Sequence, residues 1–278
     1  MAVRIVTDST CDLPRALRES LRITAVPCNI HFGSETLRDG VDIDCATFYS
    51  RLQQDSIRPT TSQPSVGQFL EAFRTVAQES NEILVVLISS KLSGTYVSAT
   101  QAKGELKGAR LEVFDSRQTS LGLGLLVQAV ARLARDGATL DECLLFLHEQ
   151  SSHIYTYFTV DTLTYLVRGG RPTRVQGLFG SLLDIKPVLE LREGEVHPMD
   201  RVRSRQRSLT RLGDLVAARK GVRSVGVMHS VCPENAATVA EAARGTHPKA
   251  EVLLSEFTPV LGVHLGPRAL GVGVWSES

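Results

Sequence analysis

The segment from Ile83 to Ala99 restricts the possible folds of this chain more than any other segment. Its first six residues, Ile83 to Ile88, are apolar and rich in β-branched side chains. A run of this kind, too short for a helix, predicts a strand that is buried on both faces of a parallel sheet. Four hydroxyl residues then surround Gly94: Ser89, Ser90, Ser93 and Thr95.

The residues after this hydroxyl cluster, 96–104, are expected to form a helix whose first free N–H groups lie near Ser93 or Gly94. In open α/β sheets, ligands bind outside the carboxyl ends of the strands, where helix N-termini favour an anionic group. We therefore expect the corner around Ser93 to hold something acidic.

Strand and helix patterns alternate from Val3 to Gln150, which is typical of a parallel sheet with helices on both faces. The pattern changes at the β-rich run His153–Val160, and a chain of 278 residues is long for one hydrophobic core. We therefore expect two α/β domains. Residues 1–157 would hold a mainly parallel sheet flanked by helices, and residues 158–278 a mixed sheet with helices.

The charges nearly cancel, with 31 lysine and arginine residues against 30 aspartate and glutamate residues. This balance gives no general attraction for nucleic acid or for an anionic membrane, so we expect neither as a partner. The arginine-rich run from 201 to 211 has no aromatic residues interleaved. It is expected to be a solvated face, with the docking of a protein partner left open.

The five cysteines are scattered and form no C-x-x-C pair, so we expect neither a disulfide framework nor a metal site of that spacing. The chain starts with a strand pattern in place of a signal peptide, and no apolar run is long enough to cross a membrane. We therefore expect a cytoplasmic protein without an integral membrane segment.

Three polar loops marked by glycine or proline carry the candidate binding residues: Thr61–Ser62, Ser93–Thr95 and His264–Gly266. Their hydroxyls, a helix-start N–H and an imidazole together make a neutral or weakly positive cradle for a carboxylate or a phosphate. A single histidine in an apolar tail is more often a core residue that bonds a backbone carbonyl. For His264, both interpretations stay open at this point.

Other hydroxyl residues near strand ends have a local explanation. Ser65 forms a capping box with Gln68 and is expected to cap a helix that runs from Val66 to Glu79. The segment Arg58–Ser65 before it contains two prolines and is expected to be a rigid polar loop. The polar residues 8–12 are expected to make turn and N-cap hydrogen bonds, with a ligand role left open.

Several segments, these loops among them, match one protein family in order and spacing: Thr7–Pro14, Arg38–Asp42, Thr61–Ser65, Ser89–Tyr96, Asp115–Ser116, Gly122–Gly124, Leu166–Arg171, Gly180–Pro187 and His264–Pro267. Through them the chain resembles, over nearly its whole length, the DegV family of fatty-acid-binding proteins. Members of this family serve as the lipid-carrying subunit of bacterial fatty acid kinase. The resemblance implies two α/β domains with a long-chain fatty acid, such as palmitate or oleate, lying between them.

The resemblance also assigns roles to the candidate residues. Thr61 and Ser93 match hydroxyls that hold the carboxylate, and His264 matches a histidine that completes their hydrogen-bond network. The neighbouring residues complete the expected lipid-binding set: Ser62, Gly94, Thr95 and Gly266. The acyl tail would be enclosed by the C-terminal domain, where composition suggests five residues for its apolar wall: Leu178, Phe179, Leu182, Leu183 and Ile185.

By the same resemblance, the chain is not an enzyme by itself and needs no cofactor. A separate kinase supplies ATP and phosphorylates the bound carboxylate, which yields an acyl phosphate for phospholipid synthesis. The sequence agrees, because it lacks the Gly-x-x-x-x-Gly-Lys-Ser/Thr loop and a helix-opening Gly-x-Gly-x-x-Gly. Arg171 is the candidate docking contact for the kinase, and the carboxylate is expected near a mouth between the domains.

Two enzymatic alternatives stay open. The first is a serine hydrolase of acyl esters with Ser93 as nucleophile and His264 as base, although Gly-x-Ser-x-Gly is absent around Ser93 and no acid partner is evident. The second is a phosphotransfer subunit that binds a hydroxyketone or a phosphate covalently through a histidine.

Arg268 departs from the family pattern, in which glycine usually follows the proline of the His264–Pro267 segment. A residue with a Cβ resists a positive φ. Either this position is not left-handed or the loop differs locally, and Arg268 is then free to offer its charge to the carboxylate or to a partner.

Overall fold

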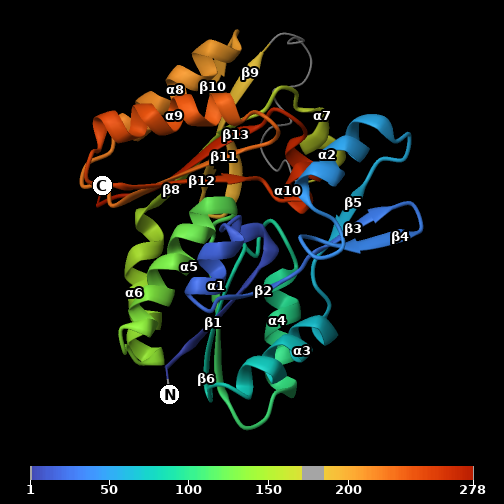
Figure 1. Cartoon of the computed structure of the whole chain (residues 1–278), viewed down its shortest axis with the longest axis vertical. Helices are drawn as coiled ribbons and strands as arrows, with labels where there is room; N and C mark the ends of the chain where they lie inside the picture. The colour runs from blue at the N-terminus through green and yellow to red at the C-terminus, as the bar shows by residue number, and fades with distance from the viewer. Residues whose placement is uncertain (1, 171–184, 278) are drawn as a thin grey trace.

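The computed structural model describes residues 2–170 and 185–277 of the 278-residue chain. Arg171 and four of the five expected tail-wall residues lie outside the described residues: Leu178, Phe179, Leu182 and Leu183. Two α/β units stack along the long axis of the molecule, as expected, and a small third sheet lies at one side (Figure 1). Within the described residues, no helix combines the length and the apolar composition needed to cross a membrane.

The first unit is built on a four-stranded parallel sheet in the order β2-β1-β6-β7. Its strands and flanking helices are β1 (Arg4–Asp8), β2 (Thr24–Val26), β6 (Glu82–Leu87), β7 (Arg110–Asp115), α1 (Arg15–Ser20), α3 (Val66–Ala77), α4 (Thr95–Glu105), α5 (Ser120–Arg135) and α6 (Leu140–Gln150). Residues 83–87 of β6 are fully buried, which confirms the expected two-sided burial. The capping box of Ser65 and Gln68 is also present at the start of α3.

The second unit holds a six-stranded mixed sheet in the order β10-β9-β8-β13-β11-β12, in which only the β11–β12 pair is parallel. Its elements are β8 (Ile154–Thr159), β9 (Lys186–Arg192), β10 (Glu195–Val202), β11 (Ser224–His229), β12 (Glu251–Glu256), β13 (Leu270–Trp275), α8 (Arg205–Ala217) and α9 (Pro233–Thr246). The fold class expected from the sequence is confirmed. Because β8 pairs only within this sheet, we infer that the second unit begins before residue 158, at Ile154.

The third sheet is antiparallel and has the order β4-β3-β5, with β3 (Asn29–Phe32), β4 (Glu35–Arg38) and β5 (Thr60–Ser62). Taken alone, the apolar pattern from Ile23 to Phe32 predicts one continuous strand. Instead the chain leaves the parallel sheet at Pro27, which has no N–H to donate, and enters the small sheet. The loop expected at Arg58–Ser65 likewise contains β5, so Thr61 pairs with Ile30 of β3 and is held by a strand.

Three further helices lie beside this sheet: α2 (Cys45–Gln54), α7 (Thr164–Arg168) and α10 (Pro259–Leu265). The α10 helix, which the glycine-rich tail did not suggest, contacts α2, α7, β3 and β5. Pro259 occupies its first turn, where a missing N–H costs nothing, and Gly266 ends it with a φ of 73°. Helix α10, which precedes β13 of the second unit, thus packs against α2, β3 and β5 from the N-terminal part of the chain.

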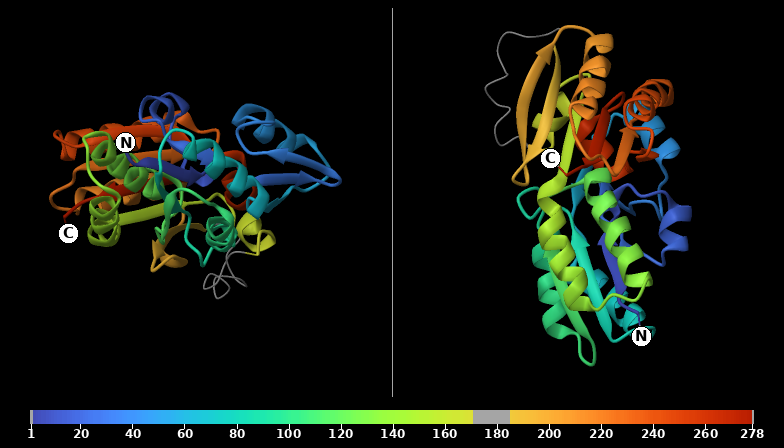
Figure 2. Two further views of the ribbon diagram at one scale, coloured as in Figure 1. Left: turned by 90° about the horizontal axis from the view of Figure 1, so that it is seen from below. Right: turned by 90° about the vertical axis from the view of Figure 1, so that its left-hand side faces the viewer.

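The start of α5 joins the two units, because this helix packs on the underside of the second sheet opposite α8 and α9 (Figure 2). Glycines allow the approach. A Cβ on Gly273 of β13 would lie 2.9 Å from the backbone nitrogen of Gly122, and one on Gly226 of β11 would lie 2.6 Å from Cβ of Leu121. The helix therefore touches the sheet almost backbone to backbone.

Buried carboxylates lie near the same junction between the two units. Asp12 accepts hydrogen bonds from the N–H of Thr258, at 3.0 Å, and from the hydroxyl of Ser120, so it connects the starts of α10 and α5. Burial raises the pKa of Asp12 to about 8 and that of Asp39 to about 7. Asp8 caps a 3-10 turn, Ser9–Cys11, by accepting from the N–H of Thr10, which confirms the local role expected for it.

Replacing Gly273 by alanine is expected to destabilise the protein by about 1–3 kcal/mol, because the new methyl group meets backbone atoms that cannot rotate away. Thermal or denaturant unfolding followed by circular dichroism measures this change. Gly245→Ala in α9 is the matched control, since nothing lies within 4 Å of its Cβ position. A loss no larger than that of the control would contradict the backbone-to-backbone packing.

Asp39→Asn is expected to change the pH dependence of stability. The ordinary pKa of 3.8 rises to about 7 in the folded chain, so the folded state holds the proton more tightly between these values. The free energy of unfolding of the wild type therefore falls as pH rises from about 4 to 7, and the variant gains relative to it over that window. Denaturant unfolding at a series of pH values measures the difference.

Asp42→Asn in the same loop is the control for this series. Its exposed carboxylate pairs with Arg38, which lowers its pKa to about 2, so its contribution changes only below about pH 4. A difference between Asp39→Asn and wild type that stays flat from about pH 4 to 7 would contradict the assignment.

Candidate functional site

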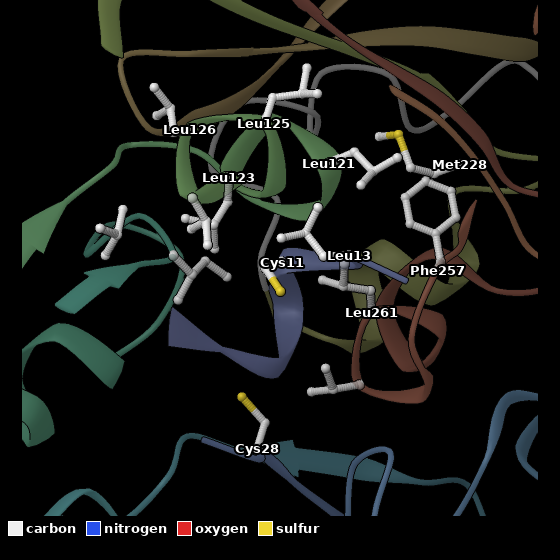
Figure 3. Close-up of a cluster of buried hydrophobic side chains, with 14 of the residues drawn as sticks. Cys11, Leu13, Cys28, Leu121, Leu123, Leu125, Leu126, Met228, Phe257 and Leu261 are labelled. Carbon is white, nitrogen blue, oxygen red and sulfur yellow. The ribbon is translucent and has the colours of Figure 1, made fainter. Parts of the chain in front are cut away.

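A cavity, here called the inner cavity, lies between the two units. Its apolar wall comes from both of them and contains Cys28, Ile88, Leu92, Phe158, Leu166, Val196, Met228, Phe257, Val260, Leu261 and Leu265. Figure 3 shows how Met228, Phe257 and Leu261 face Leu13 and Leu121 of the buried core, so part of the wall is continuous with that core. The polar part of the lining consists of Thr10, Thr61, Ser62, Gln63, Ser93, Thr119, Ser120, Thr156 and His264.

Thr61 and His264 meet at this cavity. Their Oγ1 and Nε2 atoms form a hydrogen bond of 2.9 Å, although the residues are 203 positions apart. Thr61 is placed by the pairing of β5 with β3, and His264 by the last turn of α10. A Cβ on Gly169 would overlap the imidazole, so the chain after α7 packs directly on the ring. His264 is therefore held by contacts on two sides.

Ser93 lines the same cavity at the carboxyl end of β6. Its hydroxyl lies 2.8 Å from the hydroxyl of Thr95 and accepts from the Thr95 N–H at 3.3 Å. Gly94 is the N-cap of α4, and a Cβ there would lie 2.7 Å from Nε2 of Gln63, another lining residue. The predicted helix start and its hydroxyls thus lie at the cavity, with Thr95 and Gly94 just behind Ser93.

The remaining expected residues have supporting positions. The hydroxyl of Ser62 lines the cavity and lies 3.0 Å from Nε2 of His31. Gly266 is outside the lining, but its lack of a side chain lets the ring of Tyr165 pack against the end of α10. Ile185, the described member of the expected tail wall, is half-buried and is not among the lining residues.

Arg268 adopts the left-handed conformation, with a φ of 61°, which rules out the first of the two alternatives, a position that is not left-handed. Its N–H donates to the carbonyl of Ser230 at 2.8 Å, which holds the turn. Its guanidinium donates to Asp161 at 3.0 Å, and Arg268 is not among the residues that line the inner cavity. The turn therefore keeps the geometry that glycine usually provides, and His264 still reaches Thr61.

Sequence reasoning missed several lining residues. Thr119 lines the inner cavity, and its hydroxyl is buried and has no hydrogen-bond partner in the described part of the chain. A signal existed, because Thr119 and Ser120 stand where the chain passes from β7 into α5, just as Ser93 and Thr95 stand where it passes from β6 into α4. The apolar residues from β8, β11 and α10 carried no comparable signal, since any core strand or helix has such residues.

The inner cavity has the properties of a site for an amphipathic anion. Hydroxyls, an amide and an imidazole line it beside a wide apolar wall, and no carboxylate is among its lining residues. Neutral donors favour one negative charge without the cost of burying a cation. Among the described residues, no group of three histidine, cysteine or acidic side chains is placed to hold a metal ion.

The chain is similar to known proteins over nearly its whole length. Residues 2–277 match the family model for uncharacterised proteins of the DegV family. The chain is 32% identical to Protein DegV of Bacillus subtilis (strain 168) over 276 residues, which is 98% of each chain.

Two solved structures are also similar. A DegV family protein from Thermus thermophilus described as binding fatty acid has a TM-score of 0.91 at 32% identity, over 99% of this chain and 100% of that one. DegV of Bacillus subtilis, described as a fatty acid binding protein, has a TM-score of 0.91 at 30% identity, with the same coverage. With a family match over nearly its whole length, this chain is a member of the DegV family.

Proposed function

We propose that this chain binds a long-chain fatty acid in the inner cavity, with the carboxylate at Thr61, Ser93 and His264. The observation that carries the proposal is one cavity that combines these three polar side chains with an apolar wall drawn from both units. The fatty-acid binding described for the Thermus thermophilus and Bacillus subtilis relatives supports it. Ser62 would be part of the site's lining, and Gly94, Thr95 and Gly266 would support the lining residues next to them.

The apolar wall would supply most of the affinity. Burying about fifteen methylene groups at roughly 0.8 kcal/mol each contributes on the order of 10 kcal/mol before the cost of ordering the chain. The three polar side chains would then decide which end of the ligand lies at the Thr61–His264 pair. Orientation and affinity thus come from different parts of the cavity.

We further infer that the chain presents the carboxylate to a separate kinase in the cytoplasm. A carboxylate oxygen would attack the γ-phosphorus of ATP, and the bond from that phosphorus to the bridging oxygen would break. ADP would depart as the leaving group. The product would be an acyl phosphate for phospholipid synthesis. Thr61 and His264 also line a second cavity, which supports a head group near a mouth. Arg171, outside the described residues, stays the proposed docking contact.

In this proposal the chain alone is not an enzyme and carries no cofactor beyond the bound fatty acid. A hydrolase would need a hydrogen bond from Ser93 to His264. Here the Ser93 hydroxyl bonds Thr95, and His264 Nε2 bonds Thr61. Sustained turnover of a chromogenic acyl ester by the purified chain would favour the hydrolase instead, and labelling by ATP or phosphoenolpyruvate would favour the phosphotransfer alternative.

The direct test is to denature the purified protein, extract it into organic solvent and identify the released acids by mass spectrometry. A near-stoichiometric long-chain fatty acid would support the proposal and identify the ligand. Folded protein that releases none, and that also fails to take up added palmitate or oleate, would contradict it.

Ser93→Ala and Thr61→Ala are each expected to weaken palmitate binding by about tenfold, because each removes a hydrogen bond to a charged group. The double variant should lose more. Titration calorimetry with delipidated protein measures the dissociation constants, and thermal unfolding shows whether the fold is intact.

The control for this pair is Thr75→Ala with Thr100→Ala. Both hydroxyls are exposed on helices and donate to the carbonyl four residues earlier, and neither threonine is among the lining residues of the cavity. If the Ser93→Ala/Thr61→Ala double variant bound palmitate with wild-type affinity, the assignment of the head-group site would be contradicted.

A further inference from the structure

The lining of the inner cavity contains hydroxyl residues besides those of the proposed carboxylate site. Thr119 stands at the start of α5 and Thr156 on β8, so these two come from other elements than the carboxylate site does. Leu121, two residues after Thr119, faces Met228 and Phe257 of the apolar wall (Figure 3). The hydroxyls at the start of α5 therefore lie beside the wall that would enclose the acyl chain.

Two of the lining hydroxyls near this wall already donate their protons within the protein. The Thr156 hydroxyl donates to Oε1 of Gln118 at 2.9 Å, and Nε2 of Gln118 donates to the carbonyl of Ile154 at 3.1 Å. The Ser120 hydroxyl donates to the buried carboxylate of Asp12. These bonds hold the start of α5 against β8 and α10, so both hydroxyls have a structural role.

The hydroxyl of Thr119 differs from these two. Its oxygen is buried and has no hydrogen-bond partner among the residues that the structure describes. Thr119 is the N-cap of α5, where a threonine hydroxyl commonly accepts from an N–H of the first turn, yet its side chain makes no such bond. A buried hydroxyl without a partner is unfavourable, because it has lost its hydrogen bonds to water. Thr119 thus offers an unused donor and acceptor at the cavity wall.

The chemistry of the acyl chain decides whether this hydroxyl can be satisfied by a ligand. Methylene groups neither donate nor accept, so an unsubstituted chain leaves Thr119 without a partner. A hydroxyl on the chain can do both, and it loses its own hydrogen bonds to water when it enters a cavity with an apolar wall. A bond between the two hydroxyls would remove both penalties at once.

We propose that Thr119 is a specificity-determining residue, through which the inner cavity binds long-chain hydroxy fatty acids by a hydrogen bond to a hydroxyl on the acyl chain. This inference rests on the proposed function, because the carboxylate must be held at the other polar residues for the chain to pass the start of α5. It goes further in naming a substrate class. The cavity accepts acids with an oxygen on the chain beside the unsubstituted ones.

The test compares stearate with 3-, 10- and 12-hydroxystearate by titration calorimetry on delipidated full-length protein. The wild type is expected to bind at least one hydroxystearate as tightly as stearate. In Thr119→Val, which keeps the shape and removes the hydroxyl, the dissociation constant for that hydroxystearate is expected to rise by about tenfold. Binding of stearate should stay within about twofold of wild type, because the unsubstituted chain makes no bond to Thr119.

Thr119→Ser is the matched variant, since it keeps the hydroxyl and removes only the methyl group. It is expected to bind the same hydroxystearate far more tightly than Thr119→Val does. Thr238→Val is the control for the substitution itself, because Thr238 bonds the carbonyl of Glu234 on α9 and does not line the cavity. Thermal unfolding of the delipidated variants should show no loss of stability in Thr119→Val, because the hydroxyl it removes bonds no described residue.

Several outcomes would overturn the proposal. One is a wild type that binds stearate and rejects every hydroxystearate of the series. Another is an equal change for stearate and hydroxystearate in Thr119→Val, or no change for either, since the hydroxyl would then not distinguish the ligands. A serine variant that behaves like the valine variant would assign the effect to the methyl group and overturn it as well. Failure of the proposed function is distinct, because the wild type would then bind neither stearate nor any hydroxystearate.

Discussion

The close approach of α5 to the second sheet holds the two units at one separation. Gly122 on the helix and Gly273 on β13 meet with almost no side chain between them, so a shift of either unit would open a void or create a clash. Interiors packed this tightly have a few discrete arrangements, not a continuous range. The shape of the inner cavity between the units follows from this contact.

The same junction places the polar end of the site. Asp12 connects the start of α5 with the start of α10, and α10 carries His264 on its last turn. The raised pKa values of Asp12 and Asp39 show what burial of these carboxylates costs. These contacts fix the orientation of α10, because a short helix that is anchored at its first residues holds its last turn at a defined position.

The inner cavity combines a polar end with a wide apolar wall. Its polar lining consists of hydroxyls, an amide and an imidazole, and no carboxylate is among its lining residues. A neutral lining of this kind suits a singly charged carboxylate on a long apolar chain, which is the ligand of the proposed function.

The sequence by itself determined the features that depend on neighbouring residues. The buried strand β6, the hydroxyl-rich start of α4 and the capping box at Ser65 all follow from local patterns. The segments that mark the DegV family are also local, and they pointed to Thr61, Ser93 and His264, which line one cavity.

The tertiary structure alone decided which of these local features meet. Thr61 became part of a strand only because β3 was there to pair with it, and the glycine-rich tail became α10 because α2, α7 and the small sheet cover it. The left-handed Arg268 likewise depends on partners distant in sequence, Ser230 and Asp161. Local energies select strands, helices and caps, but contacts between elements far apart in the chain are selected by packing, which no short stretch of sequence encodes.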